Sequence, residues 1–160
     1  MRYKVAPPVR SLDFLADARK AVPLVPRGEA DCCGAIQRAT GVDDREVART
    51  YLTFMRALGL VTQSDRGYHR TRTDVEAETL ATAFTERVFL VEELLETFEA
   101  GPLTADVAFE AVRDEVPRWE RERTPDWERE WREKVARLLS WAVVFDLLTV
   151  ADGTFAPAAQ

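Results

Sequence analysis

The residues best suited to chemistry in this sequence are cations gathered on two short segments. The first, DRGYHRTRTD at residues 65 to 74, turns sharply basic although the whole chain is acidic, with 28 Asp+Glu against 22 Lys+Arg. Guanidinium groups pair with phosphate through parallel hydrogen bonds, and a histidine adds a neutral or charged donor. The segment is therefore a candidate for holding phosphate groups through Arg66, His69, Arg70 and Arg72.

The second set of cations lies on the segment from residue 43 to residue 58. Apolar side chains recur there at helical spacing, which predicts a helix with one buried side, and Asp43 and Glu46 have the spacing of a capping box. Arginines on the opposite side could pair with phosphate or with the edge of guanine. Carboxylates at the start of the helix would stabilise its dipole but repel phosphate. The candidate nucleic-acid contacts on this side are Arg45, Arg49, Thr53 and Arg56.

The alternative interpretation of both sets is a solvated charged face that binds no ligand. A second observation favours a special role for this half of the chain: residues 1–74 carry a net charge of +4, whereas residues 75–160 carry −10. Such asymmetry suggests that the two halves meet different partners. Arginine also outnumbers lysine 19 to 3 in an acidic chain, which is typical of proteins from salt-loving cells.

No arrangement typical of an enzyme occurs in the sequence. There is no GxxxxGK[ST] loop and no GxGxxG motif, and no motif ties a nucleophile to His69, which is the only histidine. Cys32 and Cys33 are adjacent, which is unsuited to an ordinary disulfide, so we expect small buried side chains, or one buried and one partly exposed. With one histidine and two cysteines, no four-ligand zinc set is available from these residues. We expect a protein that is not an enzyme, without catalytic residues, metal or cofactor.

The first half of the chain reads as three helices followed by a hairpin. Ser11 can cap the first helix, which Pro23 ends, and Gly41 stops the second. Gly59 closes the third helix, and a turn of composition Ser-Asp-Arg-Gly joins two short strands. The predicted elements are helices at 12–22, 29–40 and 43–58 and strands at 60–63 and 68–72.

This order of elements resembles the winged helix-turn-helix family. The resemblance is carried by AIQRATGVDDREVARTYLTFMRALGLVTQSDRGYHRT, residues 35 to 71, with its GVDD turn, its long third helix and its glycine-containing hairpin. It implies that the third helix enters the major groove of DNA and that the hairpin, the wing, touches the backbone or minor groove.

The second half of the chain repeats this plan. Residues 51–62 and 138–149 align at a constant offset of 87, with apolar residues recurring at most paired positions. Asp152 and Gly153 then form a turn, and a helix at 104–116 would match the second helix of the first half. The segment from residue 150 to residue 155 contains no cation, so we expect this second winged unit to serve dimerisation or partner docking rather than DNA.

A single long helix, capped by Asp74 and running from about residue 75 to residue 100, is predicted between the two units. Apolar residues spaced alternately by four and three form a coiled-coil-like seam along it. Two interpretations are open: the seam packs against the winged units, or it forms a homodimer. The candidate dimer or partner contacts are Phe84, Val88, Val91, Leu95 and Phe98.

The tryptophan-rich segment 119–134 repeats Trp-Glu-Arg-Glu after eight residues. Its charges are spaced for pairs within a helix, and its tryptophans can pack into a core. The alternative is an aromatic patch for a protein partner.

The fold class predicted by the sequence is mainly α with small β-hairpins (α+β), as two winged helix-turn-helix units joined by a long central helix. Residues 1–74 form the unit expected to bind double-stranded DNA, and residues 75–160 form the linker helix and the second unit. The expected function is a DNA-binding transcriptional regulator. The alternative is a tandem winged-helix protein-interaction module, which resembles the kleisin-binding subunits of chromosome-organising complexes. No apolar run is long enough for a membrane span, and the expected location is the cytoplasm.

Overall fold

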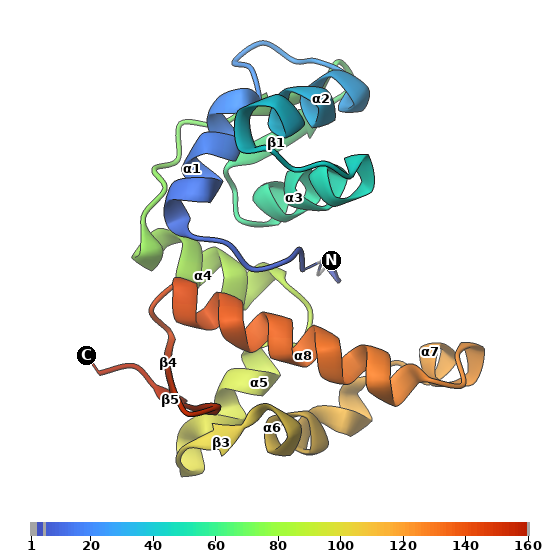
Figure 1. Cartoon of the computed structure of the whole chain (residues 1–160), viewed down its shortest axis with the longest axis vertical. Helices are drawn as coiled ribbons and strands as arrows, with labels where there is room; N and C mark the ends of the chain where they lie inside the picture. The colour runs from blue at the N-terminus through green and yellow to red at the C-terminus, as the bar shows by residue number, and fades with distance from the viewer. Residues whose placement is uncertain (1–2, 5, 160) are drawn as a thin grey trace. The chain divides into compact units, whose positions relative to one another are not determined.

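The computed structural model describes residues 3–4 and 6–159 of the chain. It contains two compact units, Met1–Val88 and Phe89–Gln160, each built from helices and a small antiparallel sheet (Figure 1). The mainly helical α+β fold predicted by the sequence is confirmed. Each unit is described below by itself. No helix among the described residues is both long enough and apolar enough to span a lipid bilayer.

The first unit opens with three helices in the predicted order. The Ser11 hydroxyl caps the first by accepting a hydrogen bond from the Phe14 N–H at 3.1 Å. Gly41 ends the second in the left-handed conformation, with φ of 79°. Phe14 and Tyr51 pack ring to ring at 4.9 Å and join the first helix to the third. The helices are α1 (Leu12–Ala21), α2 (Glu29–Thr40) and α3 (Arg45–Ala57).

The cap of α3 differs from the prediction, because Asp44 rather than Asp43 occupies the N-cap position. The Asp44 carboxylate accepts a hydrogen bond from the Glu46 N–H at 2.8 Å. Asp43 stays in the preceding loop, where its carbonyl accepts a hydrogen bond from the Gln37 amide at 2.9 Å. The capping box expected at Asp43 and Glu46 is therefore wrong by one residue.

The wing of the first unit is a hairpin of β1 (Val61–Ser64) and β2 (Gly67–Arg70). Backbone bonds between Arg27 and Tyr68, at 2.7 and 3.0 Å, attach the outer side of β2 to the α1–α2 loop. Gly67 has φ of 124°, and a Cβ added there would come 2.1 Å from the Arg27 carbonyl oxygen. A glycine is thus required where the wing crosses the loop.

The expected single helix from residue 75 to residue 100 is wrong. The chain instead forms α4 (Ala77–Arg87), α5 (Val91–Thr97) and the short η1 (Phe98–Ala100), and Glu76 rather than Asp74 precedes α4. Val88 is extended and pairs with Tyr3, whose N–H donates to the Arg87 carbonyl at 2.7 Å. Leu90 is left-handed, with φ of 78°, so helical geometry cannot continue through it. The compact unit ends at Val88, so α4 belongs to the first unit.

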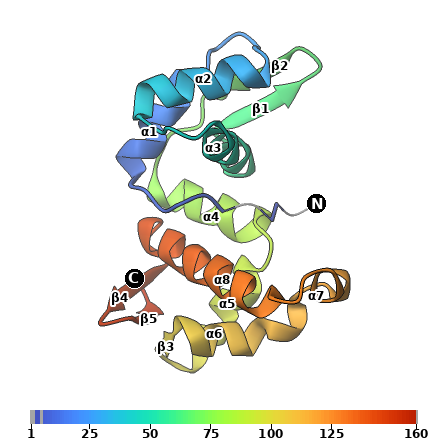
Figure 2. The same ribbon diagram turned by 45° about the vertical axis from the view of Figure 1, so that its right-hand side comes forward.

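The second unit has the element order of a winged helix (Figure 2). Its first helix is α5, its sheet has the order β3-β5-β4, and the hairpin β4–β5 is its wing. The helix predicted at 104–116 is present as α6 with Thr104 as its cap, followed by a 3₁₀ turn. The remaining elements are β3 (Leu103–Thr104), α6 (Ala105–Val112), η2 (Arg113–Glu115), α7 (Arg118–Arg123), α8 (Trp127–Val144), β4 (Leu148–Ala151) and β5 (Thr154–Pro157).

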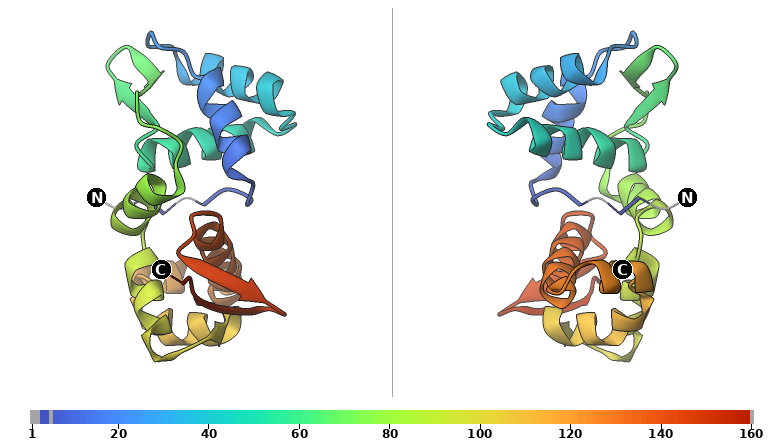
Figure 3. Two further views of the ribbon diagram at one scale, coloured as in Figure 1. Left: turned by 90° about the vertical axis from the view of Figure 1, so that its left-hand side faces the viewer. Right: turned by 90° about the vertical axis from the view of Figure 1, so that its right-hand side faces the viewer.

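The predicted repeat at an offset of 87 is present in the backbone of both units. The Leu60 N–H donates to the Met55 carbonyl at 2.9 Å, and 87 residues later the Leu147 N–H donates to the Ala142 carbonyl at 2.8 Å. The four strands of the two hairpins begin and end at equivalent residues. Figure 3 shows the two hairpins, drawn in green and red. The two units therefore share one frame from the end of the long helix to the end of the wing.

Candidate nucleic-acid interface

The four candidate residues on α3 lie on one side of that helix, since they are spaced by four, four and three residues. Arg45 and Arg49 are exposed, whereas Thr53 and Arg56 are half-buried. The opposite side carries the buried Tyr51, Met55 and other core residues. The predicted division of α3 into a core side and an outer side agrees with this burial.

Arg49, in the middle of this side, is held by carboxylates. Its guanidinium lies 2.6 Å from Glu46 in the same helix and 3.7 Å from Glu29 in the first turn of α2. The Arg49 side chain is nevertheless 53 % exposed. Surface ion pairs of this kind are weak, so a phosphate could replace the carboxylates.

Arg56 joins α3 to the wing. Its guanidinium donates to the Gln63 side-chain oxygen at 2.6 Å and lies 5.8 Å from the centre of the Tyr3 ring. Across the hairpin, Tyr68 pairs with Gln63. Burial, followed by the negative charge of Glu29, raises the pKa of Tyr68, which therefore keeps its hydroxyl proton. This corner of the candidate interface is a set of uncharged hydrogen-bonding groups around one arginine.

Three of the four candidate residues lie on the wing, and Arg72 follows it, because β2 ends at Arg70 rather than at residue 72 as predicted. The four fall into two pairs. Arg66 and Arg72 are exposed, and their side chains make no hydrogen bond or ion pair within the part of the chain that the structure describes. His69 and Arg70 are half-buried, and His69 Nδ1 and Arg70 Nε are buried without a hydrogen-bond partner. The Arg70 guanidinium reaches the Lys20 carbonyl at 3.5 Å. The first pair is free for a ligand, whereas the second helps to anchor the wing.

Three contributors to this surface were missed by reasoning from the sequence. Arg27 supplies a backbone edge for the wing, Glu29 restrains Arg49, and Gln63 binds Arg56. Each acts between elements that are distant in sequence. Only the position of Gln63 on a predicted strand, next to the basic segment, offered a signal.

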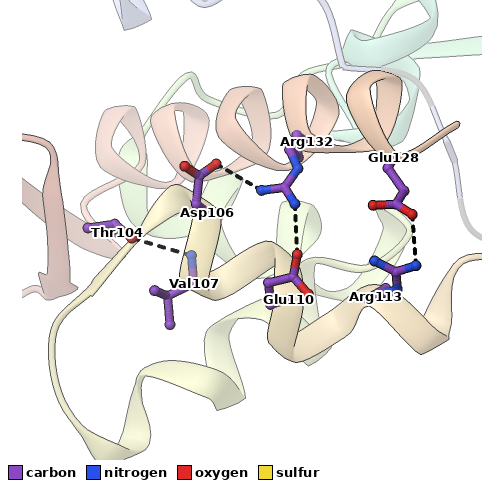
Figure 4. A network of polar contacts seen from close by, with 7 residues as sticks. All are labelled: Thr104, Asp106, Val107, Glu110, Arg113, Glu128 and Arg132. Carbon is purple, nitrogen blue, oxygen red and sulfur yellow. Dashed lines mark hydrogen bonds and ion pairs between the residues drawn. The ribbon is translucent and has the colours of Figure 1, made fainter. Parts of the chain in front are cut away.

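The second unit carries different side chains at the equivalent positions. Eighty-seven residues after Arg49, Arg56, Arg66, Arg70 and Arg72 stand uncharged residues: Ala136, Val143, Gly153, Pro157 and Ala159. The equivalent of Arg45 is Arg132, which is engaged by α6 (Figure 4). Its guanidinium lies 3.2 Å from Asp106 and 2.7 Å from Glu110, and Arg113 pairs with Glu128 at 2.8 Å beside it. Here the outer side of the long helix is neutralised within the unit.

The candidate dimer residues are largely internal. Phe84, Val88, Val91 and Phe98 are buried in the chain, and Leu95 is half-buried. Phe84 packs edge-on against Phe54 of α3 at 6.2 Å. Because the seam is split between two helices and mostly buried, a homodimer stays a prediction that calls for another surface.

Both cysteines are free and buried, which agrees with the first of the two expectations. Burial raises the pKa of both thiols, so they are protonated at neutral pH. Within residues 3–4 and 6–159, no group of three or more His, Cys, Asp or Glu side chains is arranged to hold a metal ion.

Comparison with known proteins identifies the chain at the level of family. No curated protein and no solved structure matches it. One family model does, and it is described as the halobacterial double winged helix domain; it matches residues 1–160, the whole sequence. The description agrees with the tandem winged units and with the acidic, arginine-rich composition. The chain therefore belongs to the halobacterial double winged helix domain family.

Proposed function

We propose that the first unit binds double-stranded DNA through α3 and the wing β1–β2, and that the protein acts as a transcriptional regulator. The observation that carries this proposal is the contrast between equivalent positions of the two units. Six arginines lie on α3, on the wing and two residues after it in the first unit, and five of their six equivalents are uncharged in the second. The second unit has the same backbone without these arginines, so folding does not require them. A ligand specific to the first unit explains them best.

The net charges of the two units support the same assignment. Residues 1–88 carry +2 and residues 89–160 carry −8, so a polyanion is attracted to the first unit and repelled by the second. Phosphate contacts supply much of the affinity of DNA-binding proteins and set their register. Arg66 and Arg72 can make such contacts without first losing a partner within the described residues.

The acidic residues of the first unit bias how DNA would be held. Asp43, Asp44 and Glu46 gather at the start of α3, and Glu46 already holds Arg49. Repulsion between these carboxylates and phosphate favours contact through the wing and the end of α3 that carries Arg56. The wing would then contribute more to affinity, and the middle of α3 more to base contacts.

Fluorescence anisotropy with labelled duplex DNA, titrated from low to high KCl, tests the proposal. Replacing Arg66 and Arg72 together by alanine should weaken binding to all sequences and lower the slope of log affinity against log salt by about 2. The matched control is the double replacement of Arg118 and Arg129 by alanine, which removes two exposed arginines from the second unit. The proposal fails if the parent protein binds no duplex at low salt, or if the control weakens binding as much.

A second candidate function is a protein-interaction module, and the second unit favours it. Its wing carries no cation, and Arg132 is already held by two carboxylates. The two functions are compatible, because each would use a different unit of the chain.

A further inference from the structure

We propose that the free edge of β4 in the second unit binds an extended segment of a partner protein as an additional strand. The segment would be apolar or neutral in its middle and cationic at both ends. This surface is separate from the arginines of the first unit, and the proposal does not depend on DNA binding.

Within residues 3–4 and 6–159, no backbone hydrogen bond engages the outer edge of β4. β5 lies between β3 and β4, so β4 is an edge strand (Figure 2). Asp152 and Gly153 both have positive φ, as in a type I′ two-residue turn, which makes Ala151 and Thr154 a hydrogen-bonded pair. The alternation continues to the bond from the Ala158 N–H to the Leu147 carbonyl at 3.1 Å. The backbone N–H and C=O groups of Leu148 and Val150 therefore point to the free edge.

Pro157 supports this assignment of hydrogen-bonded and non-hydrogen-bonded pairs between β4 and β5. It pairs with Leu148, at a position where β5 donates no hydrogen bond to β4, so the missing N–H of proline costs nothing there. The inner edge of β4 is consequently satisfied by β5. The outer edge matches what an added strand requires, since an incoming backbone would bond to Leu148 and Val150 alone.

The side chains beside this edge are apolar where the first unit is polar. Val150 is 48 % exposed and stands at the position of Gln63, and the half-buried Val143 stands at the position of Arg56. In the first unit these two positions form the 2.6 Å hydrogen bond between α3 and the wing. Edge strands usually carry charges that discourage pairing, yet β4 reads Leu-Thr-Val-Ala in a chain that is 31 % charged.

Charge decides which occupant fits. Exposed carboxylates flank the strand at Asp146 and Asp152, and the unit as a whole carries −8. A second copy paired antiparallel about Thr149 would set Asp146 of each chain opposite Asp152 of the other, which is repulsive. A segment with a cation at each end would meet both carboxylates favourably, so a cationic partner strand fits better than self-pairing.

The test uses the full chain and two labelled seven-residue peptides of alternating threonine and valine, one ending in lysines and the other in glutamates. Anisotropy should show the lysine peptide binding at least about tenfold more tightly than the glutamate peptide. Hydrogen exchange should show that the lysine peptide protects β4 and leaves β1 unchanged. Equal binding of the two peptides, or binding of neither, would overturn the proposal.

Two variants distinguish peptide binding at the β4 edge from binding at other acidic sites on the protein. Val150→Pro removes an outward N–H without breaking a bond to β5, so it should abolish peptide binding, while its circular dichroism reports folding. Asp146→Asn with Asp152→Asn keeps residues that tolerate the left-handed conformation and should weaken binding of the lysine peptide several-fold. A parent that sediments as a dimer and becomes monomeric on Val150→Pro would show self-pairing and overturn the cationic partner. DNA binding should be unchanged in Val150→Pro, which alters no charge, so failure here is distinguishable from failure of the proposed function.

Discussion

Gly59 and Asp146 occupy the same left-handed position of the two repeated frames, with φ of 81° and 59°. Each follows the end of its long helix, and each N–H donates to the carbonyl three residues before it, at 3.2 and 3.1 Å. The two units thus place different residues in the same left-handed conformation, glycine in the first and aspartate in the second.

Replacing Gly59 by alanine should lower the free energy of unfolding by about 1–2 kcal/mol, because an ordinary side chain is disfavoured at positive φ. The nearest atom to an added Cβ is the end of the flexible Arg87 side chain, at 3.4 Å, so backbone conformation rather than space sets the cost. Gly59→Asn should lose less, since asparagine tolerates this conformation. Urea unfolding gives the free energy of unfolding of the parent and the two variants. An alanine variant as stable as the asparagine variant would contradict the argument.

Gly67→Ala should be more damaging than Gly59→Ala. The new Cβ would lie 2.1 Å from the Arg27 carbonyl oxygen, so the wing must separate from the loop and lose the two Arg27–Tyr68 bonds. We expect a loss of at least about 2 kcal/mol from strain and lost hydrogen bonds together. Hydrogen exchange at the amides of Arg27 and Tyr68 reports the separation directly. Unchanged protection would contradict this account of Gly67.

Glu46→Gln should strengthen DNA binding about two- to fivefold at low salt. The change removes the carboxylate that lies 2.6 Å from Arg49 and frees that guanidinium for phosphate. The gain should shrink as KCl screens the interaction. Glu122→Gln is the matched control, because it removes an equal charge from an exposed pair in the second unit. Equal gains in both variants would mean that net charge alone is responsible.

Arg132→Ala should lower the free energy of unfolding by about 1 kcal/mol. It removes two ion pairs and leaves Asp106 and Glu110 facing each other without a cation. The loss should diminish in molar KCl, which screens that repulsion. Arg129→Ala, which removes one exposed pair at 3.4 Å, should have a smaller effect. Thermal unfolding at two salt concentrations makes the comparison, and a loss that grows with salt would be inconsistent with it.

The buried thiols predict a weakness at alkaline pH. Burial raises the pKa of Cys32 and Cys33, so above about pH 9 the unfolded chain gives up thiol protons that the folded chain retains. Stability should therefore be insensitive to these groups at neutral pH and should fall as pH rises above 9, where Tyr68, whose pKa is also raised, begins to add to the fall. Cys32→Ala with Cys33→Ala should flatten that fall in urea unfolding. An unaltered pH profile would exclude the thiols as its cause.

Local patterns predicted the helices and hairpins well because their determinants are local. Ser11 caps α1, Gly41 ends α2, and the apolar stripe of α3 is buried as its spacing indicates. The break at Val88 to Leu90 was missed because the contact that accompanies it is remote in sequence: Tyr3 pairs with Val88, whose backbone is extended. The apolar residues are spaced by four and three through this region, but they are divided between two separate helices.

The candidate interface shows the same division. Arg45, Arg49 and Arg56 could be assigned to one side of α3 from spacing alone. The carboxylates that hold Arg49, and the loop that holds the wing, come together only in three dimensions. The frame shared by Gly59 and Asp146 was visible as a repeat, whereas the engagement of Arg132 by α6 was not.

The interruption between α4 and α5 also fixes the length of a tether. Only three residues separate Arg87 from Val91, so their Cα atoms are four steps apart and at most about 14 Å from each other. A protein segment captured by β4 would therefore stay on the same chain as any duplex held by the first unit. Tethers this short give effective concentrations on the order of millimolar, so weak binding at each unit would suffice to bring a partner protein to DNA.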